Sequence, residues 1–110
     1  MKILHLTLKK KWFDLILLGK KKIEYRQIKK HWNKRLWDSD NMTIIKYDLI
    51  KFVNGYGKDK PFMIVEFNNC FHSDKFPPEN GEDLGGKPHF AIVLGAILET
   101  GNLKRKEVLR

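Results

Sequence analysis

Three charged side chains that could act together lie within six residues of this chain. They are Lys21, Glu24 and Arg26, in the segment Gly19-Lys20-Lys21-Lys22-Ile23-Glu24-Tyr25-Arg26. A lysine held charged beside a carboxylate suits electrostatic stabilisation better than nucleophilic attack. A partly desolvated carboxylate can act as a general base toward water. The segment therefore fits an anion- or base-binding cleft, or a hydrolytic site in which water is the attacking group.

The positive charge of the protein is concentrated around this segment. Between residues 9 and 35 there are eleven Lys or Arg and two acids, Asp14 and Glu24, and the other residues balance to zero. A single-signed patch of this kind attracts polyanions, so RNA or a nucleotide is the expected partner. The residues expected to bind it are Lys20, Lys21, Lys22, Tyr25, Arg26, Lys29, Lys30 and Trp32.

Aromatic residues are interleaved with the basic ones. A nucleobase that stacks on an aromatic ring gains ~1–3 kcal/mol. Trp12 falls on the apolar side of a predicted helix and is expected in the core, whereas Trp32 or Trp37 is expected to offer an exposed ring. His31 could contact phosphate or simply be solvated.

The hydrophobic pattern of the first 37 residues predicts four elements. Residues 2–8 read as a strand, 9–18 as an amphipathic helix, 22–28 as an alternating strand and 29–37 as a short helix or turn. Thr7 is the expected N-cap of the first helix, and Gly19 occupies the position after its last turn that favours a left-handed backbone.

The rest of the chain is predicted to be mostly strand. Residues 48–54, 61–67 and 90–98 read as strands, and Asn54-Gly55 as a tight turn. Residues 38–42 and 73–87 read as loops, and 101–110 as a charged tail. With about five strands, one helix inserted after the first strand and a second short helix, the expected fold is α+β and mainly β. A small, mostly antiparallel barrel that closes to hide its edges fits best, as one domain over residues 1–100.

These residues resemble a known family. The order strand, helix and then Gly19-x-Lys21-x-x-Glu24-x-Arg26 is similar to the signature G-x-K-x-x-E-x-R of the ASCH domain. Further likeness lies in residues 6–8, 52–56, 65–67 and 92–95, so that it spans nearly the whole chain. The resemblance implies a PUA-like β-barrel and an association with RNA.

The resemblance also implies a possible reaction. Some ASCH domains are similar to amidohydrolases that deacylate N4-acetylcytidine with a lysine, a threonine and a glutamate, and others have been described as nucleases. Lys21 matches the lysine, and Glu66 lies where the glutamate is expected. Glu24 replaces the threonine, which removes the hydroxyl nucleophile. The catalytic candidates are therefore Lys21, Glu24 and Glu66.

Several alternatives stay open from the sequence. The leading one is an RNA- or nucleotide-binding domain whose cleft is lined by the signature motif. A hydrolase acting on N4-acetylcytidine-like nucleosides or on RNA is the second, and a small basic protein-binding module is the third. Glu24 or Glu66 could also form an ion pair with Arg26 that has only a structural role.

Other classes of site have little support in the sequence. His5, His31, His72 and His89 show no metal-ligand spacing, and Gly85-Gly86-Lys87 does not open a helix as a phosphate loop does. No metal or cofactor is therefore expected. The single cysteine, Cys70, excludes an internal disulfide, and we find no signal peptide or long apolar run. A cytoplasmic protein that does not span a membrane is expected.

Overall fold

The computed structural model describes residues 1–73 and 88–103. The predicted loop 73–87 and the tail 101–110 thus lie largely outside the described residues. Most of the described chain is strand, with two short helices. The elements in chain order are β1 (Ile3–Leu8), α1 (Lys10–Leu17), β2 (Ile23–Gln27), α2 (Lys30–Leu36), β3 (Trp37–Asp38), β4 (Thr43–Ile44), β5 (Leu49–Asn54), β6 (Phe62–Ser73) and β7 (His89–Gly101).

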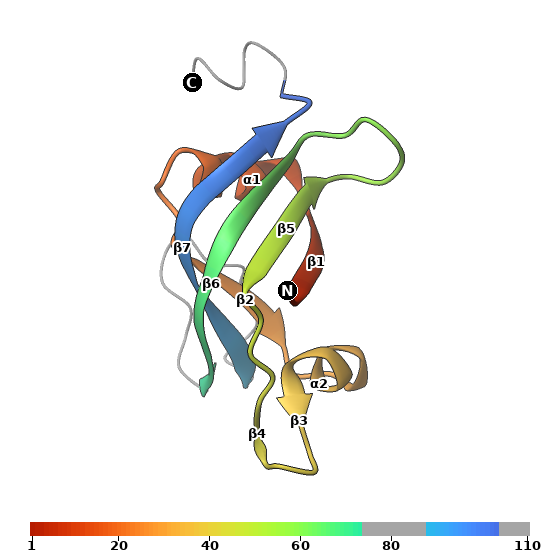
Figure 1. The fold of residues 1–110 in the computed structure, drawn as a ribbon, viewed down its shortest axis with the longest axis vertical. Helices are drawn as coiled ribbons and strands as arrows, with labels where there is room; N and C mark the ends of the chain where they lie inside the picture. Colours follow the sequence, from red (N-terminus) through yellow and green to blue (C-terminus); the bar gives the residue numbers. More distant parts are fainter. Residues whose placement is uncertain (74–87, 104–110) are drawn as a thin grey trace.

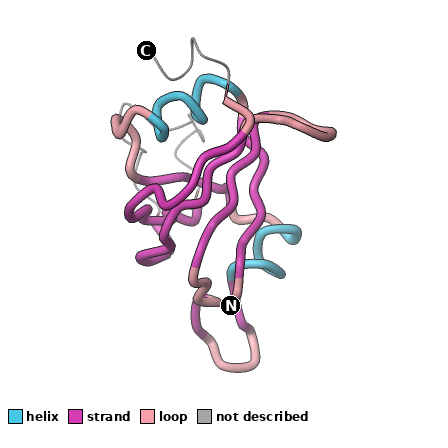
Figure 2. Tube along the Cα trace, turned by 45° about the horizontal axis from the view of Figure 1, so that its top comes forward, coloured by secondary structure: helices cyan, strands magenta, loops and turns pink. Residues whose placement is uncertain are grey.

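Five of the strands form one curled sheet in the order β1-β5-β6-β7-β2. The pairs β5–β6, β6–β7 and β2–β7 are antiparallel, and β1 runs parallel to β5. The long strands β6 and β7 bend strongly, so that the sheet curls into a half-barrel (Figure 1, Figure 2). The structure confirms the expectation of a small α+β domain that is mainly β and has a barrel-like sheet.

The sheet does not close into the expected barrel. β1 and β2 are its two edges, and within the described residues they form no backbone ladder with each other. Arg26 on β2 and Arg35 on α2 instead donate from their guanidinium groups to backbone oxygens of β1, Thr7 O at 3.2 Å and His5 O at 2.7 Å. Arginine side chains thus bridge a gap where a closed barrel would have strand pairing.

The core fills the inside of the curl. Alternate residues of the strands point inward, where side chains from α1 and α2 pack against them. Its buried members are Leu4, Leu6, Leu8, Phe13, Ile16, Leu36, Ile50, Phe52, Met63, Val65, Cys70, Phe90, Ile92 and Leu94.

Helix α1 follows the predicted pattern except at its start. Phe13 and Ile16 are its buried residues, and Gly19 adopts the left-handed backbone that ends the helix, with φ +75°. The prediction that Thr7 is the N-cap of this helix is wrong. Thr7 is still part of β1, and the N-cap is Lys9, which makes no side-chain capping hydrogen bond.

Strand β2 presents its charged residues to the inside of the curl. Glu24 lies opposite Ile92 and Arg26 opposite Phe90 on β7. Directly opposed residues of an antiparallel pair share a face, so Glu24 and Arg26 lie on the core side. Alternation predicted that Glu24 and Arg26 share a face, and the structure shows that this face is the inner one.

The later strands are longer than the sequence predicted. β6 continues past residue 67 to Ser73, and β7 runs from His89 to Gly101. Register shifts occur between residues 64 and 69 of β6, and each one disturbs the alternation of apolar and polar residues by which a strand is recognised. The sequence therefore showed only the first, regular half of β6.

Two connections also differ from expectation. The predicted loop 38–42 is the end of a small hairpin in which Trp37 pairs with Ile44. The Asn54-Gly55 dipeptide opens a longer connection than a two-residue turn. Val53 pairs with Phe62, and the intervening chain turns through two glycines, Gly55 and Gly57, with φ +92° and +102°.

Cys70 is a core residue, and its reactivity provides a test of the packing. The thiol is 4% exposed, and burial raises its pKa to about 12. Since the thiolate is the reactive form, a thiol reagent at about pH 8 should react with the native protein at least about a hundredfold more slowly than with protein unfolded in urea. Equal labelling rates for the two forms, measured by absorbance, would contradict the buried position.

Neither helix in the described part of the chain has the length and apolar character needed to cross a membrane.

Candidate functional site

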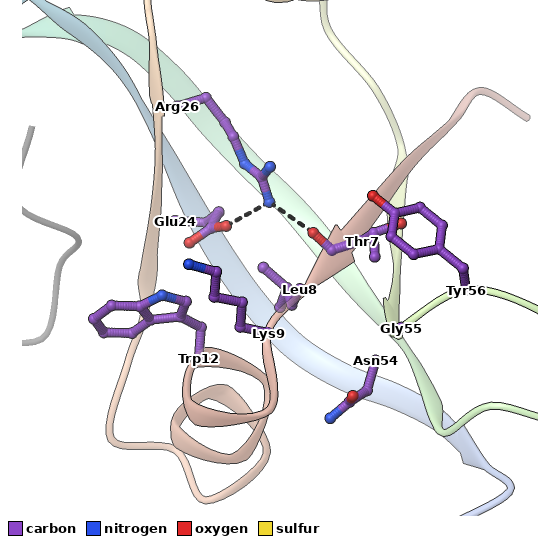
Figure 3. A pocket seen from close by; sticks show the side chains of 9 residues that line it. All are labelled: Thr7, Leu8, Lys9, Trp12, Glu24, Arg26, Asn54, Gly55 and Tyr56. Carbon is purple, nitrogen blue, oxygen red and sulfur yellow. Dashed lines mark hydrogen bonds and ion pairs between the residues drawn. The ribbon is translucent and has the colours of Figure 1, made fainter.

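A pocket of about 380 Å³ opens where β1 ends, between α1, β2 and the β5–β6 connection (Figure 3). All of these elements border one end of the half-barrel. Below we call this hollow the signature pocket, because two residues of the signature segment form one wall. Its lining residues are Thr7, Leu8, Lys9, Trp12, Glu24, Arg26, Asn54, Gly55 and Tyr56.

An ion pair between neighbours on β2 forms that wall. The Nη2 atom of Arg26 donates to Glu24 Oε2 at 2.7 Å and to the Thr7 backbone oxygen at 3.2 Å (Figure 3). The Glu24 side chain is 7% exposed and that of Arg26 is 18% exposed. Within the described residues, the buried Nε of Arg26 has no hydrogen-bond partner. The guanidinium is therefore fixed at the seam between β1 and β2, with hydrogen-bonding capacity that the protein does not use.

Lys21 lies behind Glu24. Its ammonium donates to the Ile23 backbone oxygen at 2.6 Å and is 3.5 Å from Glu24 Oε1. The nitrogen also lies over the rings of Trp12 and Tyr25, at 5.2 and 4.9 Å from their centroids. With 3% exposure, Lys21 supports the Glu24 carboxylate from inside the protein, and it is not among the residues that line the signature pocket.

The other walls are basic and aromatic. Lys9 extends from the start of α1 toward Glu24, with the Trp12 indole beside it (Figure 3). Tyr56 enters from the β5–β6 connection and is 85% exposed. The pocket thus combines a carboxylate, two cations and two aromatic rings, all within reach of a small ligand.

Glu66 does not join this cluster. It is exposed, whereas its neighbour Val65 on β6 is buried. Its Oε1 accepts a hydrogen bond from the Ala96 backbone N–H at 3.0 Å, and its Cβ lies against Gly95, where a further Cβ would be only 2.8 Å away. The irregular register of β6 at this point directs Glu66 to β7 and away from the signature pocket.

Some of the residues expected to bind nucleic acid are placed elsewhere. Tyr25 is 6% exposed, and burial raises the pKa of its hydroxyl. Its ring and that of His89 pack in a T-shaped arrangement with centroids 5.2 Å apart, and because the side chain is buried it is not available for stacking. Lys22 is exposed and lines a separate hollow of about 280 Å³ beside Gly19 and Leu94. Lys20 is exposed at the turn after α1.

The residues expected on α2 lie along the seam. Lys29 and Lys30 are exposed at the start of the helix. Trp32 is partly buried against the core, with the guanidinium carbons of Arg26 and Arg35 at 4.8 and 5.3 Å from its ring. Trp32 therefore contacts two cations and is less available as an open platform than the sequence suggested.

Sequence reasoning missed part of the lining. Trp12 was expected in the core, and Lys9, Asn54 and Tyr56 were not expected at the site. The signal that could have identified Tyr56 is its place after Asn54-Gly55, because a large exposed aromatic in a glycine-rich connection has no packing role. Because Tyr56 is far from the signature motif in the sequence, local patterns do not predict that it lies near Glu24 and Arg26 in the structure.

No group of three or more His, Cys, Asp or Glu side chains that could hold a metal ion occurs among residues 1–73 and 88–103. Comparison with family models, with curated proteins and with solved structures found no match to this chain.

Proposed function

We propose that this protein is an ASCH-type, PUA-like domain that binds RNA or a nucleotide in the signature pocket. The observation that carries the proposal is the junction of Arg26, Lys9, Glu24 and Tyr56 at one open hollow in the +9 region. Phosphate oxygens suit the two cations, and a nucleobase suits an exposed aromatic ring.

The size and polarity of the pocket favour a single nucleotide unit there. A volume of about 380 Å³ is near the lower end of the range for small-molecule sites. Glu24 is the one carboxylate among the lining residues, and a carboxylate accepts hydrogen bonds from amino or imino groups of a base. The N-terminal end of α1, beside Lys9, adds partial positive charge.

Tyr56 allows a test of base stacking without disturbing the fold. Because the side chain is 85% exposed, Tyr56→Ala should leave the midpoint of thermal unfolding unchanged. Loss of one stacked base should weaken binding by about 5- to 150-fold, the equivalent of ~1–3 kcal/mol. Fluorescence anisotropy with labelled single-stranded RNA measures this change.

Tyr56→Phe is the matched control, because it keeps the ring and removes only the hydroxyl. It should bind within about threefold of the native protein if stacking is the main contact. If Tyr56→Ala binds as tightly as Tyr56→Phe, the ring has no part in recognition.

A salt series tests the electrostatic part of the proposal. Binding should weaken steadily with increasing salt, because each phosphate that meets Lys or Arg releases counterions. Absence of binding at low salt, or an affinity that does not change with salt concentration, would contradict the proposed function.

Hydrolysis at the same pocket is a second candidate, favoured by one observation. Glu24 lines the hollow, and Lys21 supports its carboxylate at 3.5 Å from behind. Glu24 would accept a proton from a water molecule that attacks a bound acyl or phosphoryl group; the bond to the amine or alcohol of the ligand breaks, and that leaving group takes the proton. Incubation with N4-acetylcytidine and with RNA, for the native protein beside Glu24→Gln and Glu66→Gln, tests this. Turnover that depends on Glu66 and not on Glu24 would contradict a reaction in this pocket.

A further inference from the structure

A second basic hollow lies at the other end of β1. Its volume is about 580 Å³, and three lysines, Lys2, Lys34 and Lys46, meet there beside the Trp37 ring. Lys34 and Lys46 are exposed, on α2 and just after β4. The remaining lining residues are Asp38, Ser39, Thr43, Ile44 and Ile45. We call this hollow the lysine pocket.

The lysine pocket has one carboxylate, and that group is already engaged. Asp38 accepts hydrogen bonds from the side chain of Asn41 at 2.8 Å and from the backbone N–H groups of Asp40 and Asn41. The Asn41 contacts, with a smaller contribution from the charge of Lys2, hold the pKa of Asp38 below its usual value. Three cations against one carboxylate leave the hollow net positive.

Strand β1 connects the two pockets. Lys2, just before the strand, lines the lysine pocket, and Thr7 and Leu8 at its end, with Lys9 just after it, line the signature pocket. Figure 1 shows β1 running from beside α2 toward α1. At about 3.3 Å per residue, an extended chain from Lys2 to Lys9 covers about 23 Å.

Cationic groups also occupy the path between the pockets. Arg35 and Arg26 donate to His5 O and Thr7 O, which are two residues and therefore about 7 Å apart along β1. The Trp32 ring contacts both guanidiniums. Each guanidinium has five N–H donors, so one that is anchored to a backbone oxygen can still offer others to a phosphate.

We propose that the edge of β1 that pairs with no strand among the described residues is a track for single-stranded nucleic acid, with one end of the nucleic acid in the signature pocket and the other in the lysine pocket. This inference rests on the proposed function and extends it from one nucleotide to an oligonucleotide. Roughly four extended nucleotides cover the distance, at the low end of site sizes for small single-strand-binding domains. A duplex is not the expected ligand, because its bases are already paired and stacked and cannot stack on Tyr56.

The test compares ligand length in the native protein. The probes are RNA hexamers of A, C or U, the matching DNA hexamers, the matching mononucleotides and hexaglutamate. The nucleic-acid hexamer that binds best is expected to bind at least tenfold more tightly than its own mononucleotide. Comparing the affinities of its RNA and DNA forms shows whether the track prefers ribose or deoxyribose.

Variants locate the track. Lys34→Ser/Lys46→Ser should reduce hexamer affinity at least tenfold, leave mononucleotide affinity within twofold, and lower the salt dependence of hexamer binding by about 1.4 in slope. Lys22→Ser/Lys51→Ser is the matched control with the same loss of charge. Lys22 lies in neither pocket, and the Lys51 nitrogen lies over Phe62 on β6, 4.7 Å from the ring centroid. The control should change hexamer affinity by less than threefold.

The outcomes separate this inference from the proposed function. The track would be overturned if hexamer and mononucleotide bound with equal affinity, or if the two double variants lost hexamer affinity equally. Either result would leave the signature pocket as a nucleotide site. Hexaglutamate that binds as tightly as the nucleic-acid hexamers would overturn the track in favour of an acidic peptide surface. Failure of every nucleotide probe to bind would overturn both proposals.

Discussion

Glu24→Gln is expected to lower the free energy of unfolding by about 3 kcal/mol. The carboxylate is 7% exposed and lies between two cations, Lys21 at 3.5 Å and Arg26 at 2.7 Å. Removing its charge weakens the ion pairs of Glu24 with the buried Lys21 ammonium and the Arg26 guanidinium, and weakening a buried ion pair from one side costs several kcal/mol. Urea unfolding followed by tryptophan fluorescence measures the loss.

Glu66→Gln is the matched control for this change. Glu66 is exposed and accepts a hydrogen bond from the Ala96 N–H, so the same substitution there should cost less than about 1 kcal/mol. Similar losses for the two variants would mean that the Lys21–Glu24–Arg26 cluster does not stabilise the fold.

A double-mutant cycle isolates the pair. Once Lys21→Met has removed the buried ammonium, Glu24→Gln should cost about 1–3 kcal/mol less than it does alone, because the Lys21–Glu24 ion pair is already absent. A coupling energy near zero would indicate that Lys21 does not depend on Glu24.

Arg26→Gln is the second change with a large expected effect, and it acts on stability and on binding together. The guanidinium contacts Glu24 Oε2, Thr7 O and the Trp32 ring, so its loss removes the ion pair and one of the two arginine bridges to β1. We expect a loss of about 3 kcal/mol in the free energy of unfolding. Ligand affinity should fall at least tenfold, because the pocket also loses a phosphate donor.

Arg35→Gln distinguishes these contributions. Arg35 also donates to β1 and contacts Trp32, but among residues 1–73 and 88–103 it forms no ion pair with a buried carboxylate. Its replacement should therefore cost only about 1 kcal/mol, the usual net value of one hydrogen bond. Denaturation curves and anisotropy titrations on both variants provide the comparison. Equal losses of stability would show that the bridges to β1, and not the Glu24 pair, determine the effect of Arg26.

Much of the element order was predictable because it depends on local rules. Helix α1 and its end at Gly19 follow from apolar spacing and from the ease with which glycine adopts positive φ. Strands β1, β2 and β5 are regular enough to show alternation. The strand predicted over residues 61–67 is shorter than β6 because the register shifts of β6 interrupt that alternation. The β3–β4 pair is too short to produce any sequence pattern.

The sequence by itself determined that Glu24 and Arg26 share one face, because side chains alternate with a period of two along a strand. The same alternation places Lys21 on the other face, and the structure shows that its ammonium nevertheless lies 3.5 Å from Glu24 Oε1. The sequence also determined where the positive charge is concentrated, since that depends only on residue type.

Only the tertiary structure decided which other residues join them. Lys9, Trp12 and Tyr56 reach the pocket because the curl of the sheet brings the end of β1, the start of α1 and the β5–β6 connection beside β2. Glu66 is excluded because an irregular register directs it to Ala96. The way a sheet bends and which edges approach each other depend on packing between residues far apart in sequence, so no local pattern contains them.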